Sequence, residues 1–315
     1  MRSLWAALIA LGASTAGIAV WVSVGVCLLA YYSTHPVRSK RWKRTPADFG
    51  ANFEDVKFVS RDGDVGLSGW FVNPEADAVV GDGQAKGVVV LCHGMLADRR
   101  EVLPWAEALW KQGFAVLLFD FRAVGESEGE RCSAGYYEAM DLCGAVDYVS
   151  ARPDCETLAI GVFGFSMGGA AAIIAAADEH RIVAVAAHGA FASLDRALIQ
   201  RCRKHFGPLA PFAAWATRII GERWMPVPTS DVSPINAVSQ LTPRPLLLLH
   251  GILDSVVHHS DATDLHAAAG HPKTLNILPD SGHRRIPDDQ IDAVRSQVVD
   301  FFLDNLSRNT GATED

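Results

Sequence analysis

Basic residues are the minority among the charged residues of this 315-residue chain. It has 28 Lys and Arg against 36 Asp and Glu, which gives a formal net charge of −8. No basic cluster occurs outside residues 38–44, and the sequence has no internal repeat and no low-complexity segment. Because nucleic-acid binding requires a basic surface, this composition argues against a nucleic-acid partner.

A disulfide scaffold is also missing, because the six cysteines do not follow the spacing of one. Cys27 falls in an apolar N-terminal run and Cys92 in a predicted core strand. The other four are Cys132, Cys143, Cys155 and Cys202. This usage favours a reducing compartment.

The sequence offers no complete set of metal ligands. His258 and His259 are adjacent, but neighbouring side chains are expected to point apart, and no cluster of cysteines or carboxylates lies nearby in the sequence. A metal ion needs about four such ligands around one point. We therefore expect no metal site, and the sequence implies no cofactor.

Charge is absent from one long stretch, residues 4–32, which is rich in Leu, Ile, Val, Ala and Trp. As a helix this stretch extends about 43 Å, longer than the roughly 30 Å hydrocarbon core of a bilayer. The alternative is a cleaved signal peptide, whose apolar region spans only about 7 to 15 residues. We expect an uncleaved, single-pass transmembrane anchor over residues 1–34.

A basic linker, residues 35–52, follows this anchor. It contains Arg38, Lys40, Arg41, Lys43 and Arg44, whereas only Arg2 and the amino terminus precede the apolar run. The positive-inside rule then predicts a cytoplasmic catalytic domain, with the extracytoplasmic orientation as the alternative. The same residues can lie against anionic headgroups or form a solvated linker.

The most informative motif is a hexapeptide, residues 164–169, with the sequence Gly-Phe-Ser-Met-Gly-Gly and Ser166 at its centre. An apolar run rich in β-formers precedes it, and an alanine-rich segment, residues 170–177, follows. Strand, sharp turn and helix form the context of a nucleophile elbow, in which flanking glycines allow close backbone approach. This context gives specificity to a G-x-S-x-G pattern that is weak by itself.

Two later loops supply partners for that serine. Asp254 follows the apolar run of residues 245–249, and His283 follows a short predicted strand, residues 274–278. Functional groups in open α/β sheets gather at the carboxyl ends of the strands. The chain order Ser, Asp, His distinguishes one family of serine hydrolases from chymotrypsin-like and subtilisin-like enzymes.

With these motifs the sequence resembles the α/β-hydrolase superfamily over about residues 53–306. Further matching segments are residues 88–95, similar to the third strand with its His-Gly loop, residues 118–127, similar to the D-x-R-x-x-G-x-S turn, the helix at 136–149, the H-G-x-x-D pattern of residues 250–254, and the Gly-His pair at 282–283. One departure is visible, because family members often carry proline near the position of His258. The departure leaves the triad intact and affects the local loop or substrate contacts.

The resemblance implies an α/β fold, with a mostly parallel eight-stranded sheet, helices on both faces and a small helical cap. It also implies a serine hydrolase of the esterase, lipase or serine aminopeptidase type. Ser166 is then the nucleophile, His283 the general base, and Asp254 the group that orients the imidazole. Haloalkane dehalogenases and epoxide hydrolases are disfavoured, because they place Asp at the elbow.

The oxyanion hole is expected to use the backbone N–H of Met167 and one from the loop after the third strand. In that loop Gly94 precedes the two candidate donors, Met95 and Leu96. Each such donor contributes about 3 to 4 kcal/mol to the transition state.

Several residues also have purely structural explanations. Ser166 can simply occupy a tight turn, and Asp254 can cap the helix that begins near Ser260, while Asp280 is a rival acid that is better explained as a turn residue. His283 can be a solvated loop histidine. The structural explanation is favoured for four others: His93 shapes the oxyanion loop, His188 packs beneath the site, and Asp120 and Arg122 tie their turn together.

Residues 191–240 form an insertion too long for a simple crossover, with helices predicted near residues 193–206 and 211–223. Its apolar composition predicts a cap that lines an acyl pocket, although these side chains can also serve only to pack the cap. Residues 81–87 are predicted to form a hairpin loop, and residues 307–315 a disordered tail.

The resulting functional hypothesis is hydrolysis of a carboxylic ester, with a small molecule or a lipid as the substrate and the membrane as a partner of the N-terminal helix. Thioesterase and peptidase activities of the same fold remain alternatives. So do a non-catalytic α/β-hydrolase-like binding protein and a membrane-tethered scaffold. The sequence does not specify the oligomeric state.

Overall fold

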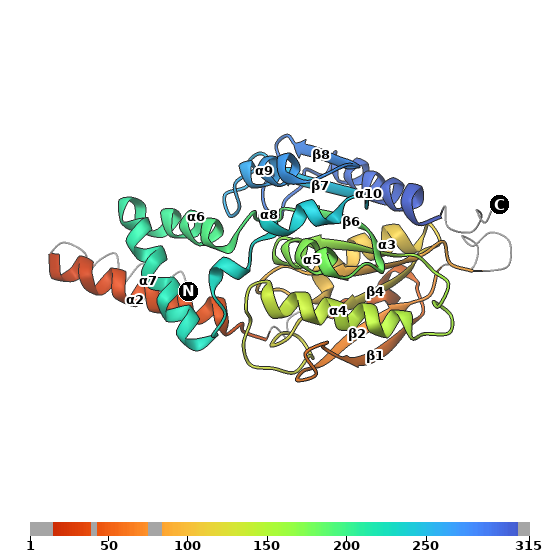
Figure 1. Cartoon of the computed structure of the whole chain (residues 1–315), viewed down its shortest axis with the longest axis horizontal. Helices are drawn as coiled ribbons and strands as arrows, with labels where there is room; N and C mark the ends of the chain where they lie inside the picture. The colour runs from red at the N-terminus through yellow and green to blue at the C-terminus, as the bar shows by residue number, and fades with distance from the viewer. Residues whose placement is uncertain (1–14, 39–42, 75–83, 308–315) are drawn as a thin grey trace.

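The structure is a computed structural model that describes residues 15–38, 43–74 and 84–307. Its centre is an eight-stranded sheet in the order β1-β2-β4-β3-β5-β6-β7-β8, shown in Figure 1. The strands are β1 (Phe53–Val59), β2 (Gly66–Val72), β3 (Val88–Cys92), β4 (Ala115–Phe119), β5 (Ile160–Phe165), β6 (Ile182–His188), β7 (Leu246–Gly251) and β8 (Lys273–Leu278).

All neighbours from β4 to β8 run parallel, whereas β2 pairs antiparallel with both β1 and β4. The central strands β3, β4 and β5 are buried along their whole length. Such strands require apolar residues at every position, which explains their Val-, Leu- and Phe-rich sequences. The α/β-hydrolase fold expected from the sequence is confirmed.

Helices cover both faces of the sheet. α4 and α5 pack on one face with α9, and α3 and α10 pack on the other. The helices of the α/β body are α3 (Leu103–Trp110), α4 (Tyr136–Ser150), α5 (Met167–Asp178), α8 (Pro234–Ala237), α9 (Ser260–Ala268) and α10 (Ile291–Leu306). Short 3₁₀ turns occur at Pro46–Phe49, Arg99–Val102, Gly207–Leu209, Thr229–Asp231 and Val238–Leu241.

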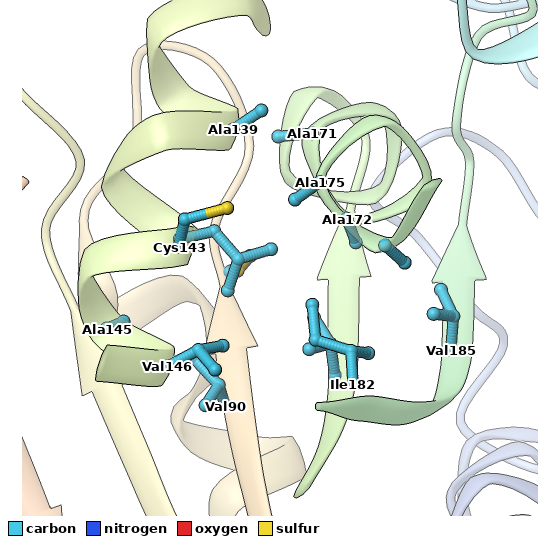
Figure 2. Packing of buried hydrophobic residues seen from close by; sticks show 14 of the residues in the cluster. Val90, Ala139, Cys143, Ala145, Val146, Ala171, Ala172, Ala175, Ile182 and Val185 are labelled. Carbon is cyan, nitrogen blue, oxygen red and sulfur yellow. The ribbon is translucent and has the colours of Figure 1, made fainter. Parts of the chain in front are cut away.

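Small side chains let α4 and α5 lie close to each other above the sheet. Figure 2 shows Ala139 and Cys143 of α4 facing Ala171 and Ala175 of α5, with strand residues such as Val90 beneath them. The alanine-rich segment after Ser166 is therefore a helix whose alanines are all buried in the core.

Three further helices form a separate group beside the sheet. They are α2 (Thr15–Thr34), α6 (Leu194–Phe206) and α7 (Ala210–Trp224), and in Figure 1 they extend away from the α/β body together. Their apolar contacts form a cluster of their own, with Val22, Val26 and Leu29 of α2 against Phe206 and Ala213 of the cap. The two helices predicted in the cap insertion are confirmed.

The hairpin predicted for residues 81–87 is wrong. β2 and β3 are not neighbours, because β4 lies between them and pairs with both. The connection is a crossover past β4, and residues 81–83 within it lie outside the described part of the chain. The first 14 residues of the predicted anchor and residues 308–315 of the predicted tail also lie outside it.

Candidate active site

Ser166 sits at the turn between β5 and α5 in a conformation that few residues with a side chain adopt. Its backbone angles are φ 53° and ψ −116°. The turn is closed by glycines, because a Cβ on Gly164 would lie 2.3 Å from the carbonyl oxygen of Gly168, and one on Gly168 would lie 2.4 Å from that of Cys92. The Ser166 N–H donates to the carbonyl of His188 on the adjacent strand (2.8 Å). This strained geometry is the one a nucleophile elbow requires.

The structure brings Ser166, His283 and Asp254 together from three separate strand ends. His283 Nε2 lies 2.9 Å from Ser166 Oγ, and His283 Nδ1 lies 2.6 Å from Asp254 Oδ2. Both distances are in the range of hydrogen bonds. The Nδ1–H of His283 therefore donates to the Asp254 carboxylate, and Nε2 of His283 accepts from the Ser166 hydroxyl. The arrangement can remove the proton of the serine hydroxyl as its oxygen attacks an electrophile.

Asp254 is anchored by more than His283. Its Oδ1 accepts the backbone N–H groups of Val256 and Val257, at 2.8 and 2.9 Å. His250 Nε2 lies 3.3 Å from Asp254 Oδ2 and 2.9 Å from the carbonyl oxygen of Val257. Because both neighbours are acceptors, the imidazole of His250 carries a proton on Nε2. Burial raises the pKa of Asp254, but the hydrogen bonds from His250 and His283 outweigh it and hold this pKa well below its usual value.

Of the two candidate acids, Asp254 is the one that is hydrogen-bonded to His283 in the described structure. Asp254 does not cap α9, whose N-cap residue is His259. Asp280 adopts a positive φ of 58°, as a turn residue can. Sequence reasoning saw His250 only as part of the H-G-x-x-D pattern and missed its contact with Asp254, which depends on the fold of the loop after β7.

The loop after β3 presents backbone donors next to Ser166. The Gly94 N–H is already occupied, because it donates to Glu101 Oε2 at 2.7 Å. Within the described residues, the N–H groups of Met95, Leu96 and Met167 have no hydrogen-bond partner. Leu96 adopts a positive φ of 62°. Met95, Leu96 and Met167 line the same pocket as Ser166.

His93 has the structural role expected of it. Its Nε2 accepts the N–H of Phe121 (3.0 Å), so the ring carries its proton on Nδ1 and donates to the Gly94 carbonyl (2.8 Å). His93 thereby ties the loop after β3 to the loop after β4.

The turn after β4 is held by its own charged residues, as predicted. Asp120 accepts the N–H groups of Arg99 and Glu126, at 2.8 and 2.9 Å. Arg122 donates to the buried carboxylate of Asp141 at 2.6 Å and to Asp62 at 2.7 Å. Neither Asp120 nor Arg122 lines the pocket around Ser166.

His188 lies beneath Ser166 and is buried. Its ring packs against the rings of Trp105 and Phe165. Burial lowers the pKa of His188 to about 3, so the ring is neutral at physiological pH. This agrees with the packing role predicted from the sequence.

The prediction that the side chains of His258 and His259 point apart is wrong. Their ring centroids lie 4.3 Å apart, because the turn before α9 directs both rings to the same side. His258 Nδ1 is hydrogen-bonded to Ser260 Oγ at 2.9 Å. Within the described residues, no group of three or more His, Cys, Asp or Glu side chains is arranged to hold a metal ion.

Ser166 and His283 open into a cavity of about 520 Å³. This volume lies within the usual range for small-molecule pockets. Its walls are mostly apolar and come from the elbow, the cap and the end of α2, which contributes Ala30, Ser33 and Thr34. Sequence reasoning assigned α2 only to anchoring and missed this contact, because residues so far apart in the sequence carry no local signal of proximity.

The sequence model of one protein family, described as serine aminopeptidase, S33, matches residues 83–240. The chain belongs to this family. It is therefore a hydrolase of the α/β fold, and the matched segment holds Ser166, the loop after β3 and the whole of the cap insertion, residues 191–240. Asp254 and His283 lie after the matched segment.

Two examples illustrate the curated relatives that align with most of this hydrolase. The uncharacterized protein YfhR of Escherichia coli K12 is 30% identical over 258 residues, covering 81% of this chain and 82% of YfhR. The α/β-hydrolase domain-containing protein WAV2 of Arabidopsis thaliana is 29% identical over 285 residues, covering 86% and 84%.

Solved structures show the same fold. The Pyrococcus furiosus esterase Pf2001 superimposes with a TM-score of 0.70 at 24% identity, covering 87% of this chain and 98% of the esterase. A dienelactone hydrolase from Anabaena variabilis gives a TM-score of 0.56 at 26% identity, covering 81% and 99%.

Proposed function

We propose that this protein is a membrane-anchored serine hydrolase that cleaves a carboxylic ester through an acyl-enzyme intermediate. One observation carries the proposal: hydrogen bonds of 2.9 and 2.6 Å link Ser166, His283 and Asp254, and both Ser166 and His283 line a mostly apolar cavity. A serine becomes nucleophilic when such a base is within hydrogen-bond reach and is itself oriented by a carboxylate.

In the first half of the reaction, Ser166 Oγ attacks the ester carbonyl and His283 Nε2 takes its proton. The N–H of Met167, with that of Met95 or Leu96, stabilises the negative charge on the carbonyl oxygen. When the tetrahedral intermediate collapses, the imidazolium returns the proton to the departing alcohol. Water then repeats these steps on the acyl-serine and releases the acid.

The pocket favours an ester over a peptide. The family description names an aminopeptidase, and such an enzyme must bind the positively charged amino terminus of its substrate. Within the described residues, Glu222 is the single acid that lines the cavity, and its Oε1 already accepts the N–H of Thr229 at 2.9 Å. Three arginines line the same cavity, which disfavours a cationic substrate.

Anchoring is the second part of the proposal. α2 has 20 residues and extends about 30 Å, and its segment from residue 17 to 34 is apolar enough to cross a bilayer, as is also true of a signal sequence. The basic residues that follow α2 favour a cytoplasmic catalytic domain. Arg38 among them donates to the carbonyl oxygens of Gly125 (3.3 Å) and Gly129 (2.9 Å), so the linker is attached to the α/β body.

Labelling with a fluorophosphonate probe tests the chemistry, with the full-length protein compared with its Ser166→Ala and His283→Ala variants. We expect labelling of the wild type alone, followed by turnover of p-nitrophenyl esters at a rate above that of thioesters and aminoacyl anilides. Preferential cleavage of aminoacyl anilides would establish the peptidase alternative. Absence of labelling in a folded wild type would favour a non-catalytic binding protein.

A further inference from the structure

The N-terminal helix is fixed to the catalytic domain at its carboxyl end. The N–H of Cys132, in the loop before α4, donates to the carbonyl of Thr34 at 2.8 Å. Toward the amino end of α2, Trp21 packs against Phe206 of α6 with ring centroids 5.2 Å apart. α2 is therefore held in a defined position relative to Ser166, unlike an anchor on a free linker.

The same helix forms a wall of the cavity above Ser166. Ala30, Ser33 and Thr34 line it from α2, opposite Thr217 and Gly221 of α7. The residues on both sides of the seam are small, and a Cβ placed on Gly221 would meet only Thr34 Cγ2, at 4.0 Å. The seam between α2 and α7 thus borders the space in which the substrate binds.

The outward faces of both helices are apolar. On α7, Phe212, Trp215 and Ile219 are 57%, 54% and 48% exposed, and their spacing of three and four residues places them on one stripe. On α2, Val20 and Val24 are 52% and 36% exposed. Exposed apolar stripes of this kind mark a surface that a partner or a membrane covers.

We propose, building on the ester hydrolysis proposed above, that the substrate is a long-chain acyl ester of a membrane lipid whose acyl chain enters between α2 and α7. The bilayer is the occupant that the geometry favours, because the helix long enough to span it is also the helix that lines the cavity. A chain that passes along this seam goes from hydrocarbon to Ser166 without crossing water.

Gly221 allows this route to be narrowed without steric conflict. A Cβ at this position meets no atom closer than 4.0 Å, and leucine has a higher helix propensity than glycine, so we expect Gly221→Leu to fold and to fill the seam. Circular dichroism of the variant checks that it is folded. The matched control is Ser23→Leu, which adds a similar side chain to an exposed position of α2 away from the cavity. The full-length proteins are reconstituted in phosphatidylcholine vesicles and assayed with p-nitrophenyl acetate and with p-nitrophenyl palmitate carried in the bilayer.

We expect wild type and Ser23→Leu to hydrolyse both esters, and Gly221→Leu to lower the palmitate-to-acetate ratio of kcat/KM by about tenfold or more. An unchanged ratio in Gly221→Leu overturns the route. So does a wild type that hydrolyses acetate and leaves palmitate intact. A wild type that hydrolyses neither ester contradicts the proposed function, and the route falls with it.

Tryptophan fluorescence tests what covers α7. Brominated phosphatidylcholine quenches indoles that contact acyl chains, so the quenched fraction should fall in Trp215→Phe relative to wild type. Equal quenching in both proteins, together with a dimer that dissociates in Trp215→Phe, would show that a second copy of the chain covers this face and would overturn the bilayer contact.

A separate observation concerns Arg201 on α6. Its side chain is partly buried and lines the cavity, its Nε is buried without a hydrogen-bond partner, and no carboxylate among the described residues pairs with it. Burial lowers its pKa, and so does the nearby charge of Arg284. A cation whose Nε is buried without a hydrogen-bond acceptor or a counter-ion is costly, so a ligand that supplies both is favoured.

We infer that Arg201 binds an anionic group of the substrate, a carboxylate or a phosphate. Arg218 and Arg284 line the same cavity, although Arg284 is already paired with Glu101, with Nε and Oε1 3.2 Å apart. The guanidinium of Arg201 is suited to both anions because its planar fork donates two parallel hydrogen bonds.

Inhibition of p-nitrophenyl acetate hydrolysis tests this inference with three amphiphiles: dodecanoate, dodecyl phosphate and neutral dodecanol. We expect the wild type to bind at least one of the anions about tenfold or more tightly than dodecanol, and the stronger anion identifies the group. Arg201→Gln should abolish this preference, whereas Arg203→Gln, at an exposed position on the same helix, should retain it. Equal inhibition by all three in wild type, or an unchanged preference in Arg201→Gln, overturns the inference.

Discussion

His250 and Asp254 are coupled beneath the candidate site: the Nε2 of the fully buried imidazole lies 3.3 Å from Asp254 Oδ2, the same oxygen that accepts from His283. Oδ2 is thus held from two sides. His250 acts on the reaction only through Asp254, so it is a positioning residue.

Replacing His250 by Phe removes this contact while keeping a ring of similar size. The lost hydrogen bond to a charged group costs about 1.5–3 kcal/mol, so kcat should fall about 10- to 100-fold with KM little changed. Steady-state kinetics with p-nitrophenyl butyrate checks this expectation. A parallel rise in KM, or an unaltered kcat, would contradict the positioning role.

Asp254→Asn should lower kcat by about 10³- to 10⁴-fold, because an amide can stabilise neither the correct tautomer of His283 nor its protonated form. Asp280→Asn is the matched control in the loop that carries His283 and should retain activity, since among the described residues the hydrogen bond to His283 Nδ1 comes from Asp254 and not from Asp280. Circular dichroism of both variants establishes that they are folded. If Asp280→Asn were the inactive variant, the assignment of the acid would be reversed.

Two glycines should respond in opposite ways to alanine. Gly168→Ala places a Cβ 2.4 Å from the carbonyl oxygen of Cys92 and should destabilise the protein by several kcal/mol. Gly221→Ala meets no atom closer than 4.0 Å and should stabilise α7 by up to about 1 kcal/mol. Thermal unfolding of both variants and of the wild type checks this: Gly168→Ala should lower the melting temperature and Gly221→Ala should raise it.

The free energy of unfolding at acidic pH should depend on Glu179, the residue at the C-terminal end of α5. The hydrogen bond from Arg181 is the largest effect on the pKa of Glu179 and lowers it. Burial acts in the opposite direction, but a second hydrogen bond, from Arg61, adds to the first, and the pKa falls to about 2. A lowered folded-state pKa stabilises the protein above the unfolded-state value of about 4.3, and this stabilisation is lost as pH falls towards 2.

Glu179→Gln should therefore cost about 1–3 kcal/mol of unfolding free energy at pH 7, and much less near pH 2. Urea unfolding at several pH values measures this difference. A cost that does not change with pH would mean that Glu179 contributes by packing and not by charge.

The cysteines should react slowly in the folded protein. Burial raises the pKa of Cys143 and Cys202 to about 11 and that of Cys155 to about 12, so few thiolates form at pH 8. Cys27 on α2 is the exposed cysteine. Titration with a thiol reagent in detergent should find at most one fast-reacting thiol in the native state and six after unfolding.

The sequence by itself determined the elbow, the strands and the order of Ser166, Asp254 and His283. These features rest on local signals: apolar runs for buried strands, glycines where a Cβ cannot fit, and polar residues directly after strands. Because parallel strands end at one edge of a sheet, this local information also predicted that the three side chains gather there.

Only the tertiary structure decided how α2 and the cap meet above Ser166. An apolar helix near the amino terminus has the same sequence pattern whether it spans a bilayer alone or lines a cavity, and nothing in that pattern pairs Thr34 with Gly221. The position of Arg201, the contact of His250 with Asp254 and the placement of β4 between β2 and β3 were likewise settled by packing. Long-range contacts depend on the whole set of faces that must be buried together, which no short segment specifies.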